Sequence, residues 1–235
     1  MTMDRLDLVK QIKQFLQTES AFGLTEIPKV SGARDVKLST YAPCPPSPNR
    51  KTQLLEDLKK EFQTCACCAL SAARTRLVFG SGSADARLMF VGEAPGRDED
   101  LQGEPFVGAA GQLLTKIIVA MKLKREEVYI ANCLKCRPPD NRNPLPAEIA
   151  ACRPILMRQI EIIKPQIICT LGKFATWALL QTTEPISRLR GRFFDWNGAR
   201  LMPTFHPAYL LRNPADKKLV WLDAQRIMKA LGINV

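Results

Sequence analysis

The sequence has no long hydrophobic run. No stretch of about 18 or more apolar residues occurs, so no membrane-spanning helix is predicted. The first 17 residues mix acidic with apolar side chains and have no apolar block followed by small residues, which argues against a signal peptide. The protein is therefore expected inside the cell, where its eight cysteines are reduced thiols or metal ligands rather than a disulfide framework.

The sequence has fewer acidic than basic residues. The 34 Lys and Arg outnumber the 23 Asp and Glu, which gives a formal net charge of +11. Such an excess attracts polyanions, whether nucleic acid or an anionic membrane surface. Charge alone does not decide, because many basic proteins bind no nucleic acid.

The start of the chain differs from the rest. Residues 4–17 carry apolar side chains at helical spacing and predict an amphipathic helix that docks on the core or on a partner. Gly, Ser, Lys and Pro dominate residues 23–50, as in an extended linker. We therefore expect an N-terminal helix and Pro-rich linker over residues 1–50 and a folded domain over residues 51–235.

Within that domain, strand and helix patterns alternate. Short apolar runs predict strands buried on both faces at residues 88–91, 128–131, 167–171 and 201–205. Helical patterns cover residues 52–62, 111–121, 147–163, 173–180 and 216–231. The alternation predicts an α/β fold of three αβα layers with a central four-stranded parallel sheet. Residues 195–198 predict a hairpin-type turn that leads into the fourth strand.

Polar residues follow three of these strands. Glu93 comes after the first, Asn132 ends the second and His206 follows the fourth. Ligands of open parallel sheets bind just beyond the carboxyl ends of the strands, so these three side chains are expected to face one crevice. A lone histidine is more often a surface or satisfied core residue. Its place at a strand end favours catalysis, because imidazole can donate a hydrogen bond to a developing oxyanion.

The loop after the first strand, residues 92–100, is rich in Gly, Pro and acidic residues. It lacks the Lys-Ser/Thr of a phosphate-binding loop, and its glycines do not fit the dinucleotide-binding pattern. Its carboxylates Glu93, Asp98, Glu99 and Asp100 could bind a divalent metal, as in a nuclease that a chelator inactivates. A nucleic-acid-binding module without catalysis is a further alternative, although the strand-end Asn and His do not fit it.

Six cysteines are grouped so as to suggest ligands: Cys65, Cys67, Cys68, Cys133, Cys136 and Cys152. Two C-x-x-C pairs in a reducing compartment are rarely accidental, and their thiolates could hold either zinc or an iron–sulfur cluster. Cys44 in the linker and Cys169 in an apolar strand are expected to be inert.

Five motifs occur in order between about residues 52 and 232. They are Phe79-Gly80-Ser81-Gly82, residues 88–100, residues 104–114 (EPFVGAAGQLL), residues 132–139 (NCLKCRPP) and residues 206–212 (HPAYLLR). Together they resemble family-4, iron–sulfur-containing uracil-DNA glycosylase. The resemblance implies a uracil-DNA glycosylase-like fold and a monomeric, monofunctional enzyme of base excision repair in the bacterial or archaeal cytoplasm. Such an enzyme flips uracil out of single- or double-stranded DNA and hydrolyses its N-glycosidic bond, leaving an abasic site.

The resemblance also implies a cofactor. Cys65, Cys68, Cys136 and Cys152 match the ligands of a structural [4Fe-4S] cluster. Cys133 and Cys67 are then not ligands.

The resemblance and the chemistry assign three residues to binding and release of the base. Phe106 offers a ring for stacking, and Asn132 has a donor and an acceptor that suit uracil O4 and N3–H but not cytosine. His206 is expected to hydrogen-bond O2 as uracil departs as an anion.

Gly92, Glu93 and Ala94 are expected to line the same pocket. In the best-known uracil-DNA glycosylases, this loop carries an aspartate that positions water and a tyrosine that excludes the methyl group of thymine. This chain has Ala94 and Gly96 there, as family 4 does. Glu99 is therefore the candidate for methyl exclusion. Water activation stays open between Glu93 and an oxocarbenium-like sugar that needs little help from the protein.

Leu210, Leu211 and Arg212 follow the histidine and are candidates for contact with DNA. Apolar side chains inserted between base steps stabilise an opened duplex. The alternative is that the leucines pack inward as the first turn of the last helix.

Overall fold

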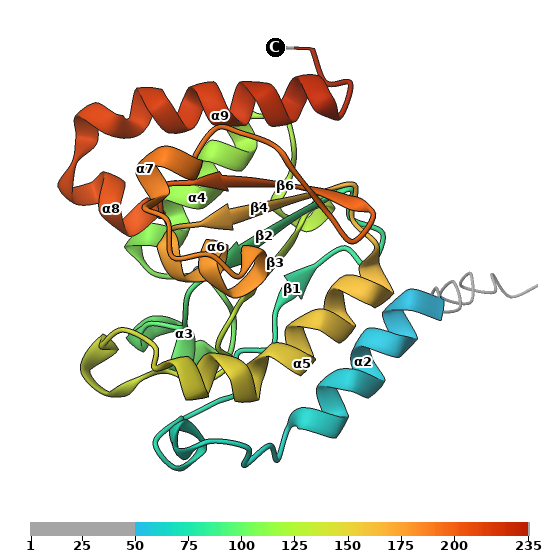
Figure 1. The fold of residues 1–235 in the computed structure, drawn as a ribbon. Helices are drawn as coiled ribbons and strands as arrows, with labels where there is room; N and C mark the ends of the chain where they lie inside the picture. The colour runs from blue at the N-terminus through green and yellow to red at the C-terminus, as the bar shows by residue number, and fades with distance from the viewer. Residues whose placement is uncertain (1–49, 235) are drawn as a thin grey trace, which may run out of the picture. The chain divides into compact units, whose positions relative to one another are not determined.

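A computed structural model describes residues 50–234 (Figure 1). Residues 1–49, with the predicted N-terminal helix and linker, lie outside the described part of the chain, as does residue 235. The α-helices are α2 (Arg50–Phe62), α3 (Arg97–Gln102), α4 (Ala109–Ala120), α5 (Pro146–Ile163), α6 (Lys173–Leu180), α7 (Ile186–Leu189), α8 (Pro207–Arg212) and α9 (Lys217–Ala230). The strands are β1 (Ser81–Gly82), β2 (Leu88–Gly92), β3 (Tyr129–Asn132), β4 (Ile167–Leu171), β5 (Phe194–Trp196) and β6 (Ala199–Thr204). Short 3₁₀ turns are η1 (Ala69–Ala72), η2 (Arg125–Glu127), η3 (Pro139–Asn141) and η4 (Pro214–Asp216).

The strands form one mixed sheet in the order β1-β3-β2-β4-β6-β5. Its four central strands are parallel, as predicted, and β1 and β5 add short antiparallel edges. The predicted turn joins β5 to β6 through Asn197 and Gly198, which have φ values of 46° and 82°. Two residues with positive φ match the right-handed twist of a two-residue hairpin.

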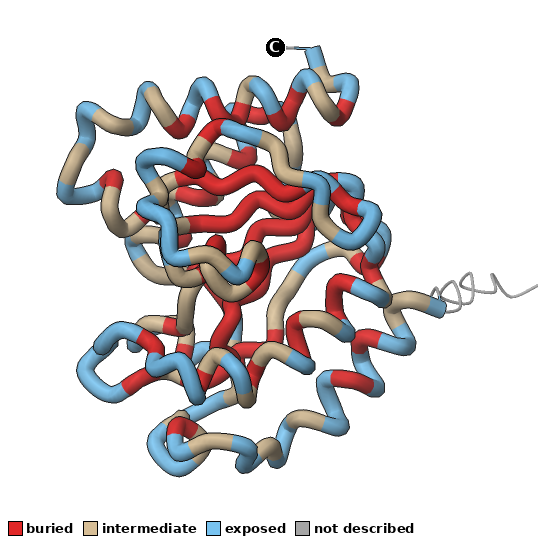
Figure 2. The backbone as a smooth tube through the Cα atoms, viewed as in Figure 1, coloured by how far each residue is buried: buried red, intermediate tan, exposed pale blue. Residues whose placement is uncertain are grey.

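Helices cover both faces of the sheet. Successive side chains of each central strand point to opposite faces, and the side chains on both faces are buried under helices. On β2, Met89 and Val91 belong to the core that includes buried residues of α2, α5 and α6. Leu88 and Phe90 belong to a second core with α4 and α9. The four central strands between these layers are almost wholly buried (Figure 2). The predicted three-layer αβα fold is confirmed.

The chain order of the strands reverses at β2. From β2 the chain continues to β3 on one side, then crosses to β4 and β6 on the other. Such a reversal leaves a crevice beyond the carboxyl ends of the strands. In Figure 1, β4 and β6 point toward α8, at the side where the crevice lies. None of the helices between residues 50 and 234 is long and apolar enough to span a bilayer.

Candidate active site

A pocket of about 410 Å³ lies at the carboxyl ends of the central strands. Six residues that the sequence placed at the site line it: Glu93, Ala94, Glu99, Phe106, Asn132 and His206. They come from the loops after β2 and β6, the end of β3, and the segment from α3 to α4. The expectation that the strand ends meet at one crevice is confirmed.

Gly92 forms the point where two of these side chains meet. A Cβ atom on Gly92 would lie 2.3 Å from Asn132 Oδ1 and 2.5 Å from Phe106 Cζ. Only glycine therefore allows the amide and the ring to approach the end of β2 this closely. Asn132 is 1% exposed, and its Oδ1 has no hydrogen-bond partner among residues 50–234. A buried acceptor without a partner is costly, so this oxygen is suited to a donor on a ligand.

Phe106 is held in a strained backbone conformation. Its φ is 54°, which is rare for a bulky residue and tends to occur at functional sites. The first turn of α4 packs directly on it, because a Cβ atom on Gly111 would lie 1.8 Å from the Phe106 carbonyl oxygen. The ring centroid lies 5.6 Å from that of His206, with 32° between the ring planes. The ring and the imidazole thus form adjoining walls.

His206 precedes α8 and accepts a hydrogen bond at Nδ1 from the Ala208 backbone N–H, at 3.1 Å. Since Nδ1 is the acceptor, the proton of the neutral ring resides on Nε2. Burial lowers the pKa of His206 to about 4, and the positive charge of Arg212 also lowers it. At neutral pH, His206 is therefore an uncharged donor through Nε2–H.

The acidic residues of the loop have separate surroundings. Burial raises the pKa of Glu93 to about 7, against the lowering effect of Lys173. Glu99 accepts hydrogen bonds from the backbone N–H groups of Gly96, Val107 and Gly108 at 3.0–3.1 Å, and so ties two loops of the pocket together.

Asp100 is buried, and both of its oxygens accept from the Thr75 backbone N–H. Throughout residues 50–234, no three His, Cys, Asp or Glu side chains are grouped so as to hold one metal ion. With Glu99 and Asp100 already occupied by backbone donors, the carboxylates give no support to the nuclease alternative.

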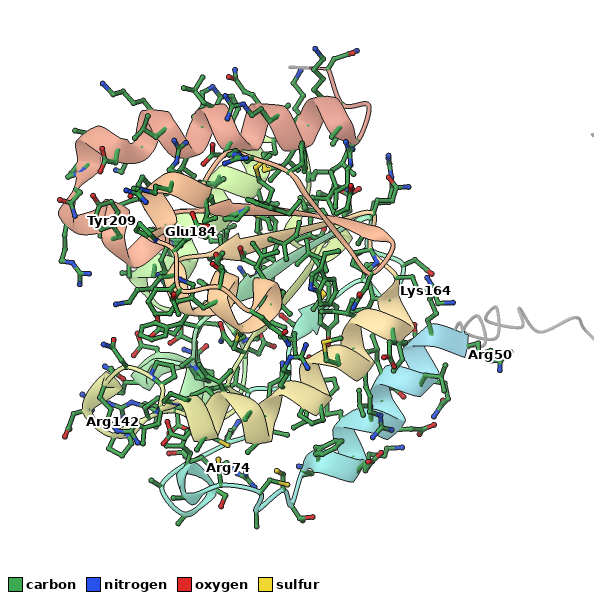
Figure 3. All side chains as sticks on the ribbon, viewed as in Figure 1. Arg50, Arg74, Arg142, Lys164, Glu184 and Tyr209 are labelled. Atoms are coloured by element: carbon green, nitrogen blue, oxygen red, sulfur yellow. The ribbon has the colours of Figure 1, made fainter. Side chains whose placement is uncertain are left out.

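The loop between β3 and α5 supplies pocket residues that the sequence analysis missed. Asn141, Arg142 and Asn143 line the pocket, and so does Tyr209 of α8. Figure 3 shows Arg142 and Tyr209 on the same side of the molecule, on different elements. Arg142 is fixed by two hydrogen bonds to the Glu148 carboxylate, at 2.6 and 3.0 Å. The dense run of turn-forming residues after the NCLKCRPP motif is the sequence feature that could have indicated a pocket loop there.

The residues after His206 divide between core and surface. Leu210 is 1% exposed, whereas Leu211 is 46% exposed and Arg212 is also exposed. Leu210 therefore packs inward and is not available for insertion between bases, which corrects its assignment to DNA contact. Leu211 and Arg212 remain accessible.

The cysteines line a second, smaller pocket. Cys65, Cys68, Cys136 and Cys152 all border it as free thiols, together with Cys67. Two of the sulfur atoms accept hydrogen bonds. The Lys135 backbone N–H donates to Cys152 Sγ at 3.2 Å, and Arg74 Nη1 donates to Cys136 Sγ at 3.3 Å.

The chemistry of this donor set fits an iron–sulfur cluster. In a [4Fe-4S] cluster each thiolate binds a different iron, so four sulfurs need only surround one space and need not converge on one ion. N–H donors to sulfur are among the features that tune such clusters. Cys133 does not line this pocket: it is 2% exposed in the core, and burial raises its pKa to about 12. The zinc site built on Cys133 and Cys136 is not supported.

Comparisons with known proteins agree with this site. Residues 79–225 match the model of the uracil DNA glycosylase superfamily. The chain is 45% identical over 180 residues to a type-4 uracil-DNA glycosylase of Thermotoga maritima, which covers 75% of this chain and 94% of the relative. It is similar to type-4 uracil-DNA glycosylases of Saccharolobus solfataricus (45% over 187 residues; 76% of this chain, 87% of the relative) and Archaeoglobus fulgidus (42% over 186 residues; 76% and 94%). The chain therefore belongs to the uracil-DNA glycosylase superfamily and, within it, to the type-4 enzymes.

Proposed function

We propose that this protein repairs DNA by excising uracil: it hydrolyses the N-glycosidic bond of a flipped deoxyuridine and leaves an abasic site. Membership of the type-4 family supports this function. The observation that carries it is the meeting of the Asn132 amide and the neutral His206 imidazole beside the Phe106 ring in one pocket.

Asn132 is proposed to read the base. Its Oδ1, which has no hydrogen-bond partner in the described part of the chain, accepts from uracil N3–H, and its Nδ2 donates to O4. Cytosine presents an acceptor at N3 and a donor at N4, so both hydrogen bonds would be lost. Because unpaired buried polar groups are costly, such a site rejects the wrong base strongly.

His206 and Phe106 are proposed to act at different stages. Phe106 stacks on the flipped base before and during bond cleavage, which contributes about 1–3 kcal/mol. His206 donates from Nε2–H to O2 as negative charge develops on the departing uracil, so its contribution arises mainly in the transition state.

Glu93 is proposed as the residue that activates water. The C1′–N1 bond breaks with its electron pair leaving on uracil, and the water oxygen bonds to C1′ of the deoxyribose. The Glu93 carboxylate takes the proton released by that water. A pKa of about 7 suits a general base that acts near neutral pH.

Glu99 is proposed to bar the methyl group of thymine, with its carboxylate fixed by three backbone donors. Leu211 and Arg212 are proposed to contact the DNA beside the flipped nucleotide, and the Lys and Arg surplus to attract both single- and double-stranded DNA.

Cys65, Cys68, Cys136 and Cys152 are proposed to hold a [4Fe-4S] cluster. The role of the cluster here would be structural, since hydrolysis of a glycosidic bond moves no electrons to or from the protein. These ligands fasten the segment after α2 and the start of α5 to the loop after β3, next to the base-reading Asn132.

The test is an excision assay on oligonucleotides that contain one uracil, cytosine or thymine, single-stranded and duplex, run in parallel with added Mg²⁺ and with a chelator of divalent ions. Alkali then cleaves any abasic sites. We expect breaks at uracil alone. Absence of breaks at uracil would leave a non-catalytic DNA-binding module, and breaks that need a divalent ion but no alkali would indicate a nuclease.

A further inference from the structure

A lysine lies fully buried between the two pockets. Lys135, in the loop after β3, is 0% exposed. Its Nζ donates to the Asn132 carbonyl oxygen at 2.9 Å and to Gln159 Oε1 at 2.6 Å. Lysine is almost never fully buried unless it is paired, and neither of these acceptors is a carboxylate. Burial of this ammonium group therefore costs free energy that two neutral acceptors offset only in part.

Gln159 extends this contact into a buried network. Its Nε2 donates to the Phe79 carbonyl oxygen at 2.9 Å and to the Tyr129 hydroxyl at 3.1 Å, and Gln159 is itself 0% exposed. Tyr129 begins β3 and Asn132 ends it. Phe79 belongs to the Phe-Gly-Ser-Gly motif, for which the proposed chemistry has no use. The network thus links α5, both ends of β3 and that motif.

The backbone of Lys135 is equally engaged. Its N–H donates to Cys152 Sγ, and its carbonyl oxygen accepts from the Val78 N–H at 2.9 Å. The two residues before it continue the pairing of β3 with β2, through bonds from Cys133 N–H to the Gly92 carbonyl oxygen (2.9 Å) and from Leu134 N–H to that of Glu93 (3.0 Å). Lys135 therefore bonds to both pockets: to Cys152 of the smaller pocket (the cysteine pocket) and to Asn132 of the larger one (the base pocket).

We infer that Lys135 is a positioning residue for base recognition: its ammonium group holds the carbonyl of Asn132 and so fixes the end of β3 from which the Asn132 amide meets the base. Among residues 50–234 the Asn132 Oδ1 accepts no hydrogen bond, so no such bond fixes the position of this oxygen. The backbone beneath it must do so. An apolar side chain of the same volume at position 135 would supply no donor, so the Asn132 carbonyl would lose this hold on its place.

This inference rests on the proposed function, because its readout is uracil excision. The test compares Lys135→Met with Gln159→Met. Both remove the Lys135–Gln159 hydrogen bond from the core, but only Lys135→Met removes the bond to the Asn132 carbonyl. Thr170→Val serves as a control, since it removes a buried hydrogen bond to Thr176 (2.8 Å) outside this network.

Each variant is assayed well below its melting temperature for single-turnover excision rate, affinity for free uracil, affinity for undamaged duplex, and iron content. For Lys135→Met we expect the excision rate to fall between about tenfold and a hundredfold, as small misplacements at active sites do. Uracil affinity should weaken, whereas duplex affinity and iron content stay unchanged. Gln159→Met and Thr170→Val should lower the melting temperature yet keep excision rates close to that of the unmodified protein.

Two results overturn the inference: an unchanged rate and uracil affinity in Lys135→Met, or an equal loss of rate in Gln159→Met. The second would make the network merely structural. If Lys135→Met does not fold, the milder Lys135→Gln, whose amide is too short to reach the Asn132 carbonyl in the same way, is judged by the same criteria. An unmodified protein that releases no uracil would overturn the proposed function and this inference together, whereas an active protein with a normal Lys135→Met variant overturns the inference alone.

Discussion

The base pocket and the cysteine pocket are neighbours with opposite designs. In the base pocket, polar atoms are left for a ligand: Asn132 Oδ1 accepts no hydrogen bond from residues 50–234, and His206 Nε2 is the donor because Nδ1 already accepts one. In the cysteine pocket, the sulfurs of Cys136 and Cys152 already accept N–H donors from the protein. The first arrangement suits a ligand that arrives and leaves, and the second suits a group that stays. Removing a residue from the first should therefore change rates, and removing one from the second should change the fold.

The largest effect is expected in the cysteine pocket. Cys152→Ser should abolish most of the iron content and yield little soluble protein, because a lost ligand leaves the start of α5 unattached to the loop after β3. Cys169→Ser is the matched control: this thiol is also buried, at 1% exposed, but it lies within β4. Iron and sulfide analysis of anaerobically purified protein measures both. Full iron content in Cys152→Ser, or zinc in place of iron, would contradict the ligand assignment.

In the base pocket, His206→Ser should have the greatest effect. Loss of one donor to a developing anion lowers the rate by about 10²–10³. The affinity for uracil-containing DNA should stay nearly unchanged, because the hydrogen bond strengthens only as uracil departs. A single-turnover assay with a parallel binding measurement separates the two quantities. Near-normal turnover would remove His206 from the chemistry.

Phe106→Ala should differ from His206→Ser in kind. Stacking is present before and during bond cleavage, so the DNA affinity and the excision rate should fall together. The two losses combined should correspond to about 1–3 kcal/mol. The same two measurements apply. A rate that falls while DNA affinity stays constant would show that the ring acts in the transition state instead.

The smallest effect is expected from pH. Glu93 with a pKa of about 7 is protonated below that pH and cannot take a proton from water, so the single-turnover rate should fall as the pH drops from 8 to 6. His206, with a pKa of about 4, stays neutral over this range and adds no second change of rate with pH. In Glu93→Gln the rate should not depend on pH over this range. In Lys173→Met the fall in rate should begin at a higher pH, because Lys173 lowers the pKa of Glu93. A flat profile in the unmodified protein would remove Glu93 as the base.

Much of the fold follows from the sequence because the central strands are buried on both faces. Unbroken apolar runs mark such strands, and β2, β3, β4 and β6 lie within two residues of the predicted bounds. The edge strands β1 and β5 have only two and three residues, too few to show a period. Their pairing comes from contact with the sheet and not from a local pattern.

The site divides in the same way. The rule that ligands bind at strand ends placed Glu93, Asn132 and His206 together without a structure. No local rule shows that Leu210 turns inward while Leu211 faces solvent, since both belong to one turn of α8. Nor could the sequence show Lys135 in the core, because the side chain that receives it there lies 24 residues away on α5.

The proposed chemistry requires that a neutral imidazole with its proton on Nε2 faces the base. His206 is the only histidine of the chain, so ¹⁵N NMR of untagged protein labelled at histidine reports on this ring alone. We predict one protonated nitrogen, Nε2, and one unprotonated nitrogen, Nδ1, with no change between pH 8 and pH 5.5, since the pKa is about 4. A ring that gains a second proton near pH 6.5, or one that carries its single proton on Nδ1, would rule out this role for His206.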